Sequence, residues 1–121
     1  MKKILVVDDS ATVRQQVGMA LGQGGYQVVE AADGVDGLSQ LEKGGVSMVI
    51  CDVNMPRMSG LDMLDAMKRD PKLASIPIVM LTTEGQPALM ERAKKAGAKG
   101  WIVKPFKADL MLAAVGKLVG G

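Results

Sequence analysis

The chain alternates five short apolar runs with longer stretches in which apolar residues recur at three- and four-residue steps. The runs at residues 4–7, 48–51 and 78–81 contain no polar residue, which is typical of central parallel strands covered on both faces. We expect strands at residues 4–8, 27–31, 48–52, 78–82 and 100–103, each followed by an amphipathic helix. Five strand–helix pairs with short connections, (βα)5, predict one α/β domain over residues 1–121, built on a doubly wound parallel sheet.

Capping residues and glycines mark the expected helix ends. Ser10 can cap the first helix and Pro87 suits the first turn of the fourth, while glycines at 24–25, 44–45 and 97 can end the helices before them. The expected core-facing residues are Val13, Val17, Ala20 and Leu21 in the first helix, Val35, Leu38 and Leu41 in the second, Leu61, Leu64 and Met67 in the third, and Leu110, Ala114 and Leu118 in the last.

Histidine is absent from the sequence, and its absence removes whole classes of chemistry. Ser-His-Asp and Cys-His nucleophile pairs, histidine-ligated zinc hydrolase sites and imidazole acid–base catalysis are all excluded. The lone Cys51 can form no internal disulfide, and we interpret it as a buried strand residue. Carboxylate, lysine and hydroxyl chemistry on a hard metal ion remains.

Hydropathy and charge set further bounds. No apolar run approaches the ~20 residues that span a bilayer, and the first apolar run stops at Asp8, short of the ~7–15 residues of a signal peptide core. We therefore expect a cytoplasmic protein with no membrane partner. The net charge of +2 does not by itself indicate nucleic-acid binding, and none is expected. From Glu84 onward seven bases face three acids, which fits either a solvated helix face or a partner surface.

Polar side chains stand where four of the expected strands end. Asp8 and Asp9 end the first strand and Asp52 the third, while Thr82 ends the fourth and Lys104 follows the fifth. The carboxyl ends of parallel strands share one edge of the sheet, and ligands of open α/β sheets bind at that edge. We therefore expect these five side chains to gather in one place.

Three neighbouring carboxylates repel one another unless a cation joins them, and a set of oxygen ligands selects Mg2+, with Mn2+ as the alternative, over zinc. We interpret Asp52 as a nucleophile that attacks a phosphoryl donor directly, since a carboxylate beside a metal needs no general base. Lys104 would supply a positive charge to the phosphoryl oxygens, and Thr82 a hydroxyl donor.

The arrangement of motifs resembles the receiver domains of bacterial two-component response regulators along essentially the whole chain. The segments that carry the resemblance are Val6-Val7-Asp8-Asp9-Ser10, Asp52-Val53-Asn54-Met55-Pro56 with Ser59-Gly60, Met80-Leu81-Thr82-Thr83-Glu84, and Trp101-Ile102-Val103-Lys104-Pro105-Phe106. The resemblance implies a flavodoxin-like, CheY-like fold with strand order 2-1-3-4-5. In that order the sheet reverses between the first and third strands, which bear the three aspartates.

The resemblance also implies a role for each metal-site residue. Asp52 would be the phosphoacceptor. Asp9, Asp52 and the main-chain carbonyl of Asn54 would be Mg2+ ligands, and Asp8 would act mostly through water. Lys104 would pair with the phosphoryl group, and the Lys104–Pro105 peptide bond would be cis.

Further positions carry expected switching and regulatory roles by the same resemblance. Thr82 would move toward the phosphoryl group on activation, and Trp101 stands where a Tyr or Phe rotamer switch is usual. The side chains of Asn54 and Glu84 would tune spontaneous dephosphorylation and meet a phosphatase.

Within the family, the chain is similar to the stand-alone chemotaxis regulators. It ends at Gly120-Gly121, soon after the last expected helix, so we expect no output domain. The expected protein is a monomeric phosphoacceptor and not an enzyme. Its expected partners are a chemotaxis histidine kinase and a flagellar motor-switch protein or other acidic helix, bound through the fourth helix, fifth strand and fifth helix.

Three alternatives remain open from the residues. A phosphate sink that drains a kinase would have the same sequence features as a motor binder. An aspartate-nucleophile, Mg2+-dependent phosphatase of the haloacid dehalogenase type would need an acid two residues after Asp52, where Asn54 stands. A flavodoxin-like electron carrier would need a phosphate-binding loop after the first strand, where Asp8 and Asp9 would repel the phosphate.

Overall fold

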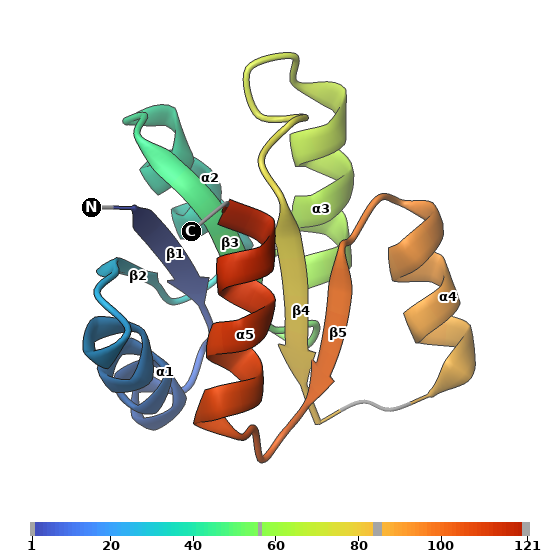
Figure 1. The fold of residues 1–121 in the computed structure, drawn as a ribbon. Helices are drawn as coiled ribbons and strands as arrows, with labels where there is room; N and C mark the ends of the chain where they lie inside the picture. The colour runs from blue at the N-terminus through green and yellow to red at the C-terminus, as the bar shows by residue number, and fades with distance from the viewer. Residues whose placement is uncertain (1, 56, 84–85, 120–121) are drawn as a thin grey trace.

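The computed structural model describes residues 2–55, 57–83 and 86–119, and within them strands and helices alternate along the chain. The strands are β1 (Lys3–Val7), β2 (Gln27–Ala31), β3 (Val46–Cys51), β4 (Ile78–Thr82) and β5 (Gly100–Val103). The helices are α1 (Ala11–Gln23), α2 (Gly34–Glu42), α3 (Gly60–Arg69), α4 (Pro87–Lys95) and α5 (Ala108–Val119). The strands form one parallel sheet in the order β2-β1-β3-β4-β5, and the strand arrows point to the same edge (Figure 1). The expected fold class and strand order are confirmed.

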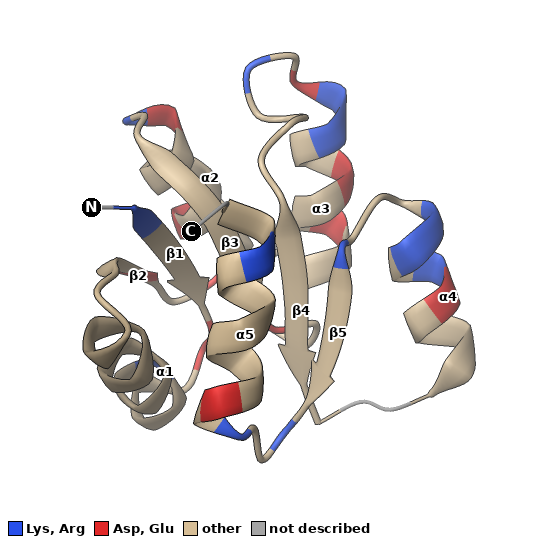
Figure 2. Ribbon diagram, viewed as in Figure 1, with Lys and Arg blue, Asp and Glu red and all other residues tan. Residues whose placement is uncertain are grey.

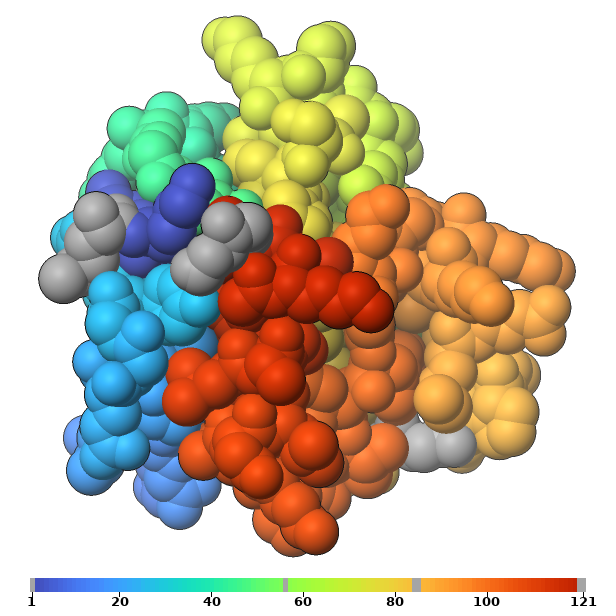
Figure 3. All heavy atoms as spheres, in the orientation of Figure 1, coloured from blue at the N-terminus to red at the C-terminus, as the bar shows by residue number. Residues whose placement is uncertain are grey.

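The sheet carries a separate hydrophobic core on each face, as a doubly wound fold requires. Along β1, Leu5 and Val7 belong to the core that α2, α3 and α4 cover, while Ile4 and Val6 belong to the core that α1 and α5 cover. This division follows from the alternation of side chains along a strand. Figure 3 shows the second of these faces, with α5 lying beside α1.

Two strands end one residue earlier than expected. β1 ends at Val7 and β3 at Cys51, so Asp8 and Asp52 stand just beyond the sheet edge. The register pairs Val7 with Cys51, and the Asp52 amide donates to the Val7 carbonyl at 2.9 Å. The two aspartates therefore leave adjacent strands at the same level.

Several expected helix signals are confirmed. Ser10 caps α1 by accepting a hydrogen bond from the Val13 amide, and Pro87 stands in the first turn of α4. Gly97, just after α4, has φ of +107°, a left-handed conformation that glycine adopts without a steric penalty.

The expected core faces of two helices are partly wrong. Leu110 is 64% exposed, and the buried residues of α5 are Met111 and Val115. α5 is apolar around much of its circumference, so more than one four-residue stripe can be drawn along it, and packing against β3 and α1 selects the other one. Val35 at the start of α2 is 42% exposed as well.

Within the described ranges, no helix has the length and apolar character needed to cross a membrane.

Candidate functional site

The three predicted aspartates come together at the carboxyl edge of the sheet. Each of Asp8, Asp9 and Asp52 offers one carboxylate oxygen, and these oxygens all lie within 4.8 Å of one another. They gather because β1 and β3 are neighbours with no strand between them, at the point where the strand order reverses. Asp8 and Asp52 are buried, whereas Asp9 is exposed.

Asp8 is fixed through both of its carboxylate oxygens. Oδ1 accepts a hydrogen bond from the Ser10 amide at 2.9 Å, and Oδ2 accepts one from Lys104 Nζ at 2.7 Å. The main-chain carbonyl of Asp8 accepts a further hydrogen bond from the guanidinium of Arg14. Sequence reasoning missed Arg14, because nothing in a helical arginine signals a contact with the strand end that precedes its helix.

The Asp52 carboxylate is also held at both ends, but more loosely. Its Oδ1 accepts from the Val53 amide at 2.7 Å, and its Oδ2 lies 3.4 Å from Lys104 Nζ. Behind it, a Cβ added to Gly60 would come within 1.9 Å of the Asp52 carbonyl oxygen. Only glycine therefore allows α3 to start this close to the end of β3.

Lys104 links two of the aspartates from the far end of the chain. Burial alone would lower the pKa of Lys104, but the hydrogen bond to Asp8 and the charges of Asp52 and Asp8 outweigh it, and the pKa is raised above its ordinary value. The ammonium group is therefore charged at neutral pH. The Lys104 amide donates to the Thr82 carbonyl at 2.8 Å, and the Lys104–Pro105 peptide bond is cis.

The remaining predicted site residues that the structure describes differ in burial. Thr82 is fully buried at the end of β4, and Asn54 is exposed in the segment that follows β3. Trp101 is half-buried in β5 and packs against the core under α3 and α4. Glu84 lies outside the described residues.

Cys51 does not contribute a nucleophile to the site. It is fully buried, as expected, and burial, with the charges of Asp52 and Asp8, raises the pKa of its thiol. A neutral thiol is a poor nucleophile and a poor metal ligand.

The donor set fits a hard divalent cation. Three carboxylates and one lysine leave a local charge of about −2, and the nearby ligand atoms are oxygens. Asp8, Asp9 and Asp52 are thus the residues that could hold Mg2+. The cluster is small and lies at a surface, which leaves it open to a phosphoryl oxygen.

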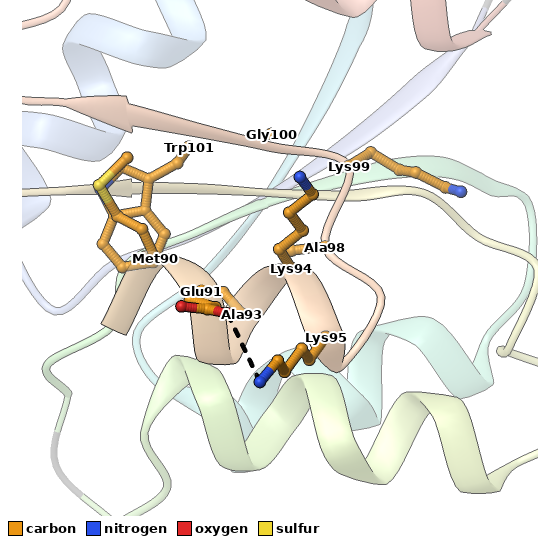
Figure 4. Close-up of a pocket in the computed structure, with 9 residues that line it drawn as sticks. All are labelled: Met90, Glu91, Ala93, Lys94, Lys95, Ala98, Lys99, Gly100 and Trp101. Atoms are coloured by element: carbon orange, nitrogen blue, oxygen red, sulfur yellow. Dashed lines mark ion pairs between the residues drawn. The ribbon is translucent and has the colours of Figure 1, made fainter. Parts of the chain in front are cut away.

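A second feature is a groove of about 750 Å3 between α4 and β5. Trp101, Gly100, Lys94 and Lys99 are among the residues that line it. In Figure 4 the Lys94 side chain rises from α4 toward β5, the Lys99 side chain extends away from Trp101, and Lys95 pairs with Glu91 at 3.5 Å. The basic residues of α4 lie in the carboxyl-terminal half of that helix (Figure 2). The sequence shows the excess of basic residues in this region, but it did not predict a groove. A groove depends on the distance between α4 and the sheet, which the sequence pattern does not specify.

Comparison with known proteins agrees with this geometry. The family model described as the response regulator receiver domain matches residues 4–116. The chain is 41% identical over 111 residues to chemotaxis protein CheY1 of Helicobacter pylori, covering 90% of each, and 36% identical over 117 residues to chemotaxis protein CheY of Pseudomonas aeruginosa, covering 96% of this chain and 94% of the relative. The solved structure of Vibrio cholerae chemotaxis protein CheY4 superposes with a TM-score of 0.91 at 40% identity, covering 98% of each chain. The chain therefore belongs to the response regulator receiver domain family.

Proposed function

We propose that this chain is a single-domain response regulator of a chemotaxis phosphorelay, which accepts a phosphoryl group on Asp52 from a histidine kinase. The observation that carries the proposal is the Asp8–Asp9–Asp52 cluster within 4.8 Å, with Lys104 reaching both buried members. The chemotaxis assignment is supported by the names of the relatives that cover nearly the whole chain. We expect a cytoplasmic monomer.

The two oxygens of the Asp52 carboxylate are held to different degrees, Oδ1 at 2.7 Å from the Val53 amide and Oδ2 at 3.4 Å from Lys104 Nζ. Oδ1 is held by the Val53 amide, so Oδ2, on the side of Lys104, is the oxygen we assign to the new bond with phosphorus. That bond forms as the phosphorus–nitrogen bond of a phosphohistidine breaks and the donor imidazole takes up a proton. Lys104 would turn from Asp8 toward the phosphoryl oxygens and stabilise their charge.

Bound Mg2+ would offset the repulsion of the three carboxylates and coordinate a phosphoryl oxygen. Asp8, Asp9 and Asp52 would hold it, with the Asn54 main-chain carbonyl as a further ligand. The side chain of Asn54 would tune spontaneous dephosphorylation, together with Glu84, and these positions are where we expect a phosphatase to act.

The register of β4 and β5 suggests how the signal leaves the site. Thr82 pairs with Val103 and Met80 pairs with Trp101, so Thr82 and Trp101 lie on the same face of adjacent strands. A movement of the Thr82 side chain toward the phosphoryl group would open space on that face. We propose that Trp101 repacks into this space, in the way that a local event biases a two-state element.

The groove between α4 and β5 supports a partner of a particular kind. It combines the half-buried indole of Trp101 with Lys94 and Lys99, neither of which has an ion pair with an acidic residue in the part of the chain that the structure describes. An acidic amphipathic helix would bury its apolar side on Trp101 while its charges meet the lysines. We propose that the occupant is an acidic segment of a flagellar motor-switch protein or the docking domain of the chemotaxis kinase.

Of two other functions, a phosphate sink and a phosphatase, the site supports the first better than the second. A phosphate sink uses the same pocket and differs only in lacking a motor partner, so it stays as the second candidate. A haloacid dehalogenase-type phosphatase is disfavoured, because Asn54 cannot donate a proton to a leaving group from the position that such enzymes give to an aspartate.

The proposal is tested by incubating the protein with Mg2+ and labelled acetyl phosphate. One alkali-labile phosphoryl group is expected on Asp52, and none in Asp52→Asn, which keeps the shape of the side chain. Label that persists in Asp52→Asn would move the phosphoacceptor elsewhere. Turnover of a generic phosphomonoester by the wild type would favour the phosphatase.

A further inference from the structure

The segment between β3 and α3, which carries Asn54, is tied to a different part of the chain by an ion pair. Arg57 Nε lies 2.7 Å from Asp33 Oδ2, and Arg57 Nη2 lies 2.7 Å from the same oxygen. Asp33 precedes α2, so this contact joins two loops at the carboxyl edge of the sheet. The proposed phosphorylation chemistry uses neither residue.

The side chain of Asp33 is held in place because each of its two carboxylate oxygens has its own hydrogen-bond partner. Oδ1 caps α2 by accepting from the Asp36 amide at 2.9 Å, which leaves Oδ2 to Arg57, and the Asp36 carboxylate accepts in return from the Ala32 amide at 3.2 Å. Asp33 is only 5% exposed. The hydrogen bond from the Asp36 amide, assisted by Arg57, holds its pKa below the ordinary value, so the anchor is ionised at neutral pH.

On the loop side of the ion pair, Arg57 has a backbone conformation that is unfavourable for its residue type. Arg57 has φ of +65°, a left-handed conformation that residues with a side chain rarely adopt. Its neighbour Met58 sits on Gly34, where an added Cβ would lie 2.7 Å from Met58 Cγ. The loop therefore touches the start of α2 at two consecutive residues, Arg57 and Met58.

The same loop is also fastened to the phosphoacceptor end of β3. The Gly60 amide donates to the Val53 carbonyl at 2.9 Å, and Gly60 lies directly against the Asp52 carbonyl. The loop that carries Asn54 is thus attached at two places, to the end of β3 through Gly60 and to Asp33 through Arg57. Without the ion pair to Asp33, the loop that carries Asn54 would be less restrained, while the hydrogen bond from Gly60 to Val53 would still hold the end of β3.

We propose that Asp33 and Arg57 are positioning residues whose ion pair holds the Asn54 loop in the geometry that binds Mg2+. The inference rests on the proposed function, since it takes the Asn54 carbonyl as a ligand of the metal. Residues that orient ligands from outside the coordination sphere commonly change metal affinity by roughly 10–100-fold when altered. Because this pair acts on a loop and not directly on a ligand, we expect the lower end of that range.

Three variants separate the effect of the ion pair on Mg2+ binding from its effect on the stability of the fold. Asp33→Asn keeps a good N-cap for α2 but loses the charge that binds Arg57. Arg57→Gly removes the guanidinium while providing a residue that adopts a positive φ readily. Arg57→Lys keeps the charge and should keep most of the Mg2+ affinity.

The test is calorimetric titration of Mg2+ into the unphosphorylated protein. Asp33→Asn and Arg57→Gly should each raise the Mg2+ dissociation constant by about tenfold. The double variant should resemble either single variant and not show a hundredfold loss, because both substitutions break the same contact. Asp65→Asn is the matched control: it breaks a 3.0 Å ion pair with Arg92 between α3 and α4, and should leave the Mg2+ dissociation constant unchanged.

The results distinguish this inference from the proposed function. Variants that lower the melting temperature but keep the wild-type Mg2+ affinity would reduce the pair to a structural role and overturn the inference. Multiplicative losses in the double variant would overturn it too. Wild-type protein that binds Mg2+ yet takes no phosphoryl group from acetyl phosphate would instead contradict the proposed function, while the ratio of variant to wild-type affinity would still test the ion pair.

Discussion

Lys104 donates a 2.7 Å hydrogen bond to Asp8, and the two residues are 96 positions apart in the chain. In this state the lysine is the counter-charge of the acidic cluster, so it competes with any cation for the same carboxylates. The competition is physical and measurable. Removing the ammonium group of Lys104 should therefore raise the affinity for Mg2+ but lower the rate of phosphorylation.

Lys104→Met should bind Mg2+ more tightly than the wild type does, by roughly tenfold, or ~1.4 kcal/mol. The variant keeps the length of the side chain but removes the ammonium group beside Asp8 and Asp52. Without Mg2+ it should lose ~1–2 kcal/mol of unfolding free energy, because the buried carboxylates have no cation. Titration calorimetry and thermal melts with and without Mg2+ measure both effects.

Phosphorylation of the same variant should slow in spite of its tighter metal binding. Lys104 is the residue that we expect to stabilise the phosphoryl oxygens, and no other lysine is in contact with Asp52 among the described residues. The initial rate of labelling by acetyl phosphate at saturating Mg2+ checks this. Equal or weaker Mg2+ affinity in Lys104→Met would show that the lysine does not compete for the carboxylates.

Asp9→Asn should raise the melting temperature in the absence of Mg2+ and remove most of the increase that Mg2+ gives the wild type. Asp9 is the exposed member of the cluster, so losing its charge relieves repulsion without leaving a buried polar group. Wild-type protein should gain melting temperature with millimolar Mg2+, because the cation binds the folded state alone.

The control for Asp9→Asn is Glu42→Gln. Glu42 is exposed at the end of α2, at the opposite edge of the sheet, and the change removes one negative charge as well. It should keep the full response to Mg2+. A wild-type protein whose melting is insensitive to Mg2+ would refute the metal site itself.

The sequence predicted the elements and the members of the acidic cluster well, for a physical reason. Buried parallel strands are apolar throughout, and the residue where such a strand ends is therefore visible as the first charge, as at Asp8 and Asp52. The carboxyl ends of parallel strands share an edge, so the cluster follows from the sheet. The strand order came from the family resemblance and not from the pattern.

Contacts between loops could not be predicted in this way. The Asp33–Arg57 ion pair depends on a positive φ at Arg57, which the residue type argues against. The contact of Arg14 with the Asp8 carbonyl depends on a turn and not on a periodic pattern. The exposure of Leu110 has the same origin, since a helix that is apolar on several sides does not specify which side faces the sheet.

Trp101 should report phosphorylation by a change in its fluorescence emission. It is the only tryptophan, and it is half-buried on the same sheet face as Thr82. Beryllium fluoride with Mg2+ mimics an acyl phosphate on Asp52, and the space that Thr82 vacates should let the indole move inward. Emission should shift to shorter wavelength as the ring leaves water.

Thr82→Ala separates the switch from simple quenching by the ligand. The alanine variant should bind beryllium fluoride and Mg2+ without the emission shift, because it has no hydroxyl to move. Thr82→Ser, which keeps the hydroxyl, should retain the shift. A wild-type spectrum that does not change would leave Trp101 as a static core residue.

The groove between α4 and β5 should bind an acidic motor-switch segment more tightly after phosphorylation, by the roughly 5–150-fold that allosteric coupling usually gives. Lys94 and Lys99 line this groove, whereas Lys95 is already paired with Glu91. Lys94→Glu with Lys99→Glu should therefore slow association and reverse its salt dependence, while acetyl phosphate still labels Asp52.

The control for this prediction is Lys43→Glu with Lys72→Glu. This pair changes the net charge equally at exposed sites outside the groove, and should have a much smaller effect on association. Equal affinity of the segment for phosphorylated and unphosphorylated protein would favour the phosphate sink, because a motor signal requires a difference between the two states.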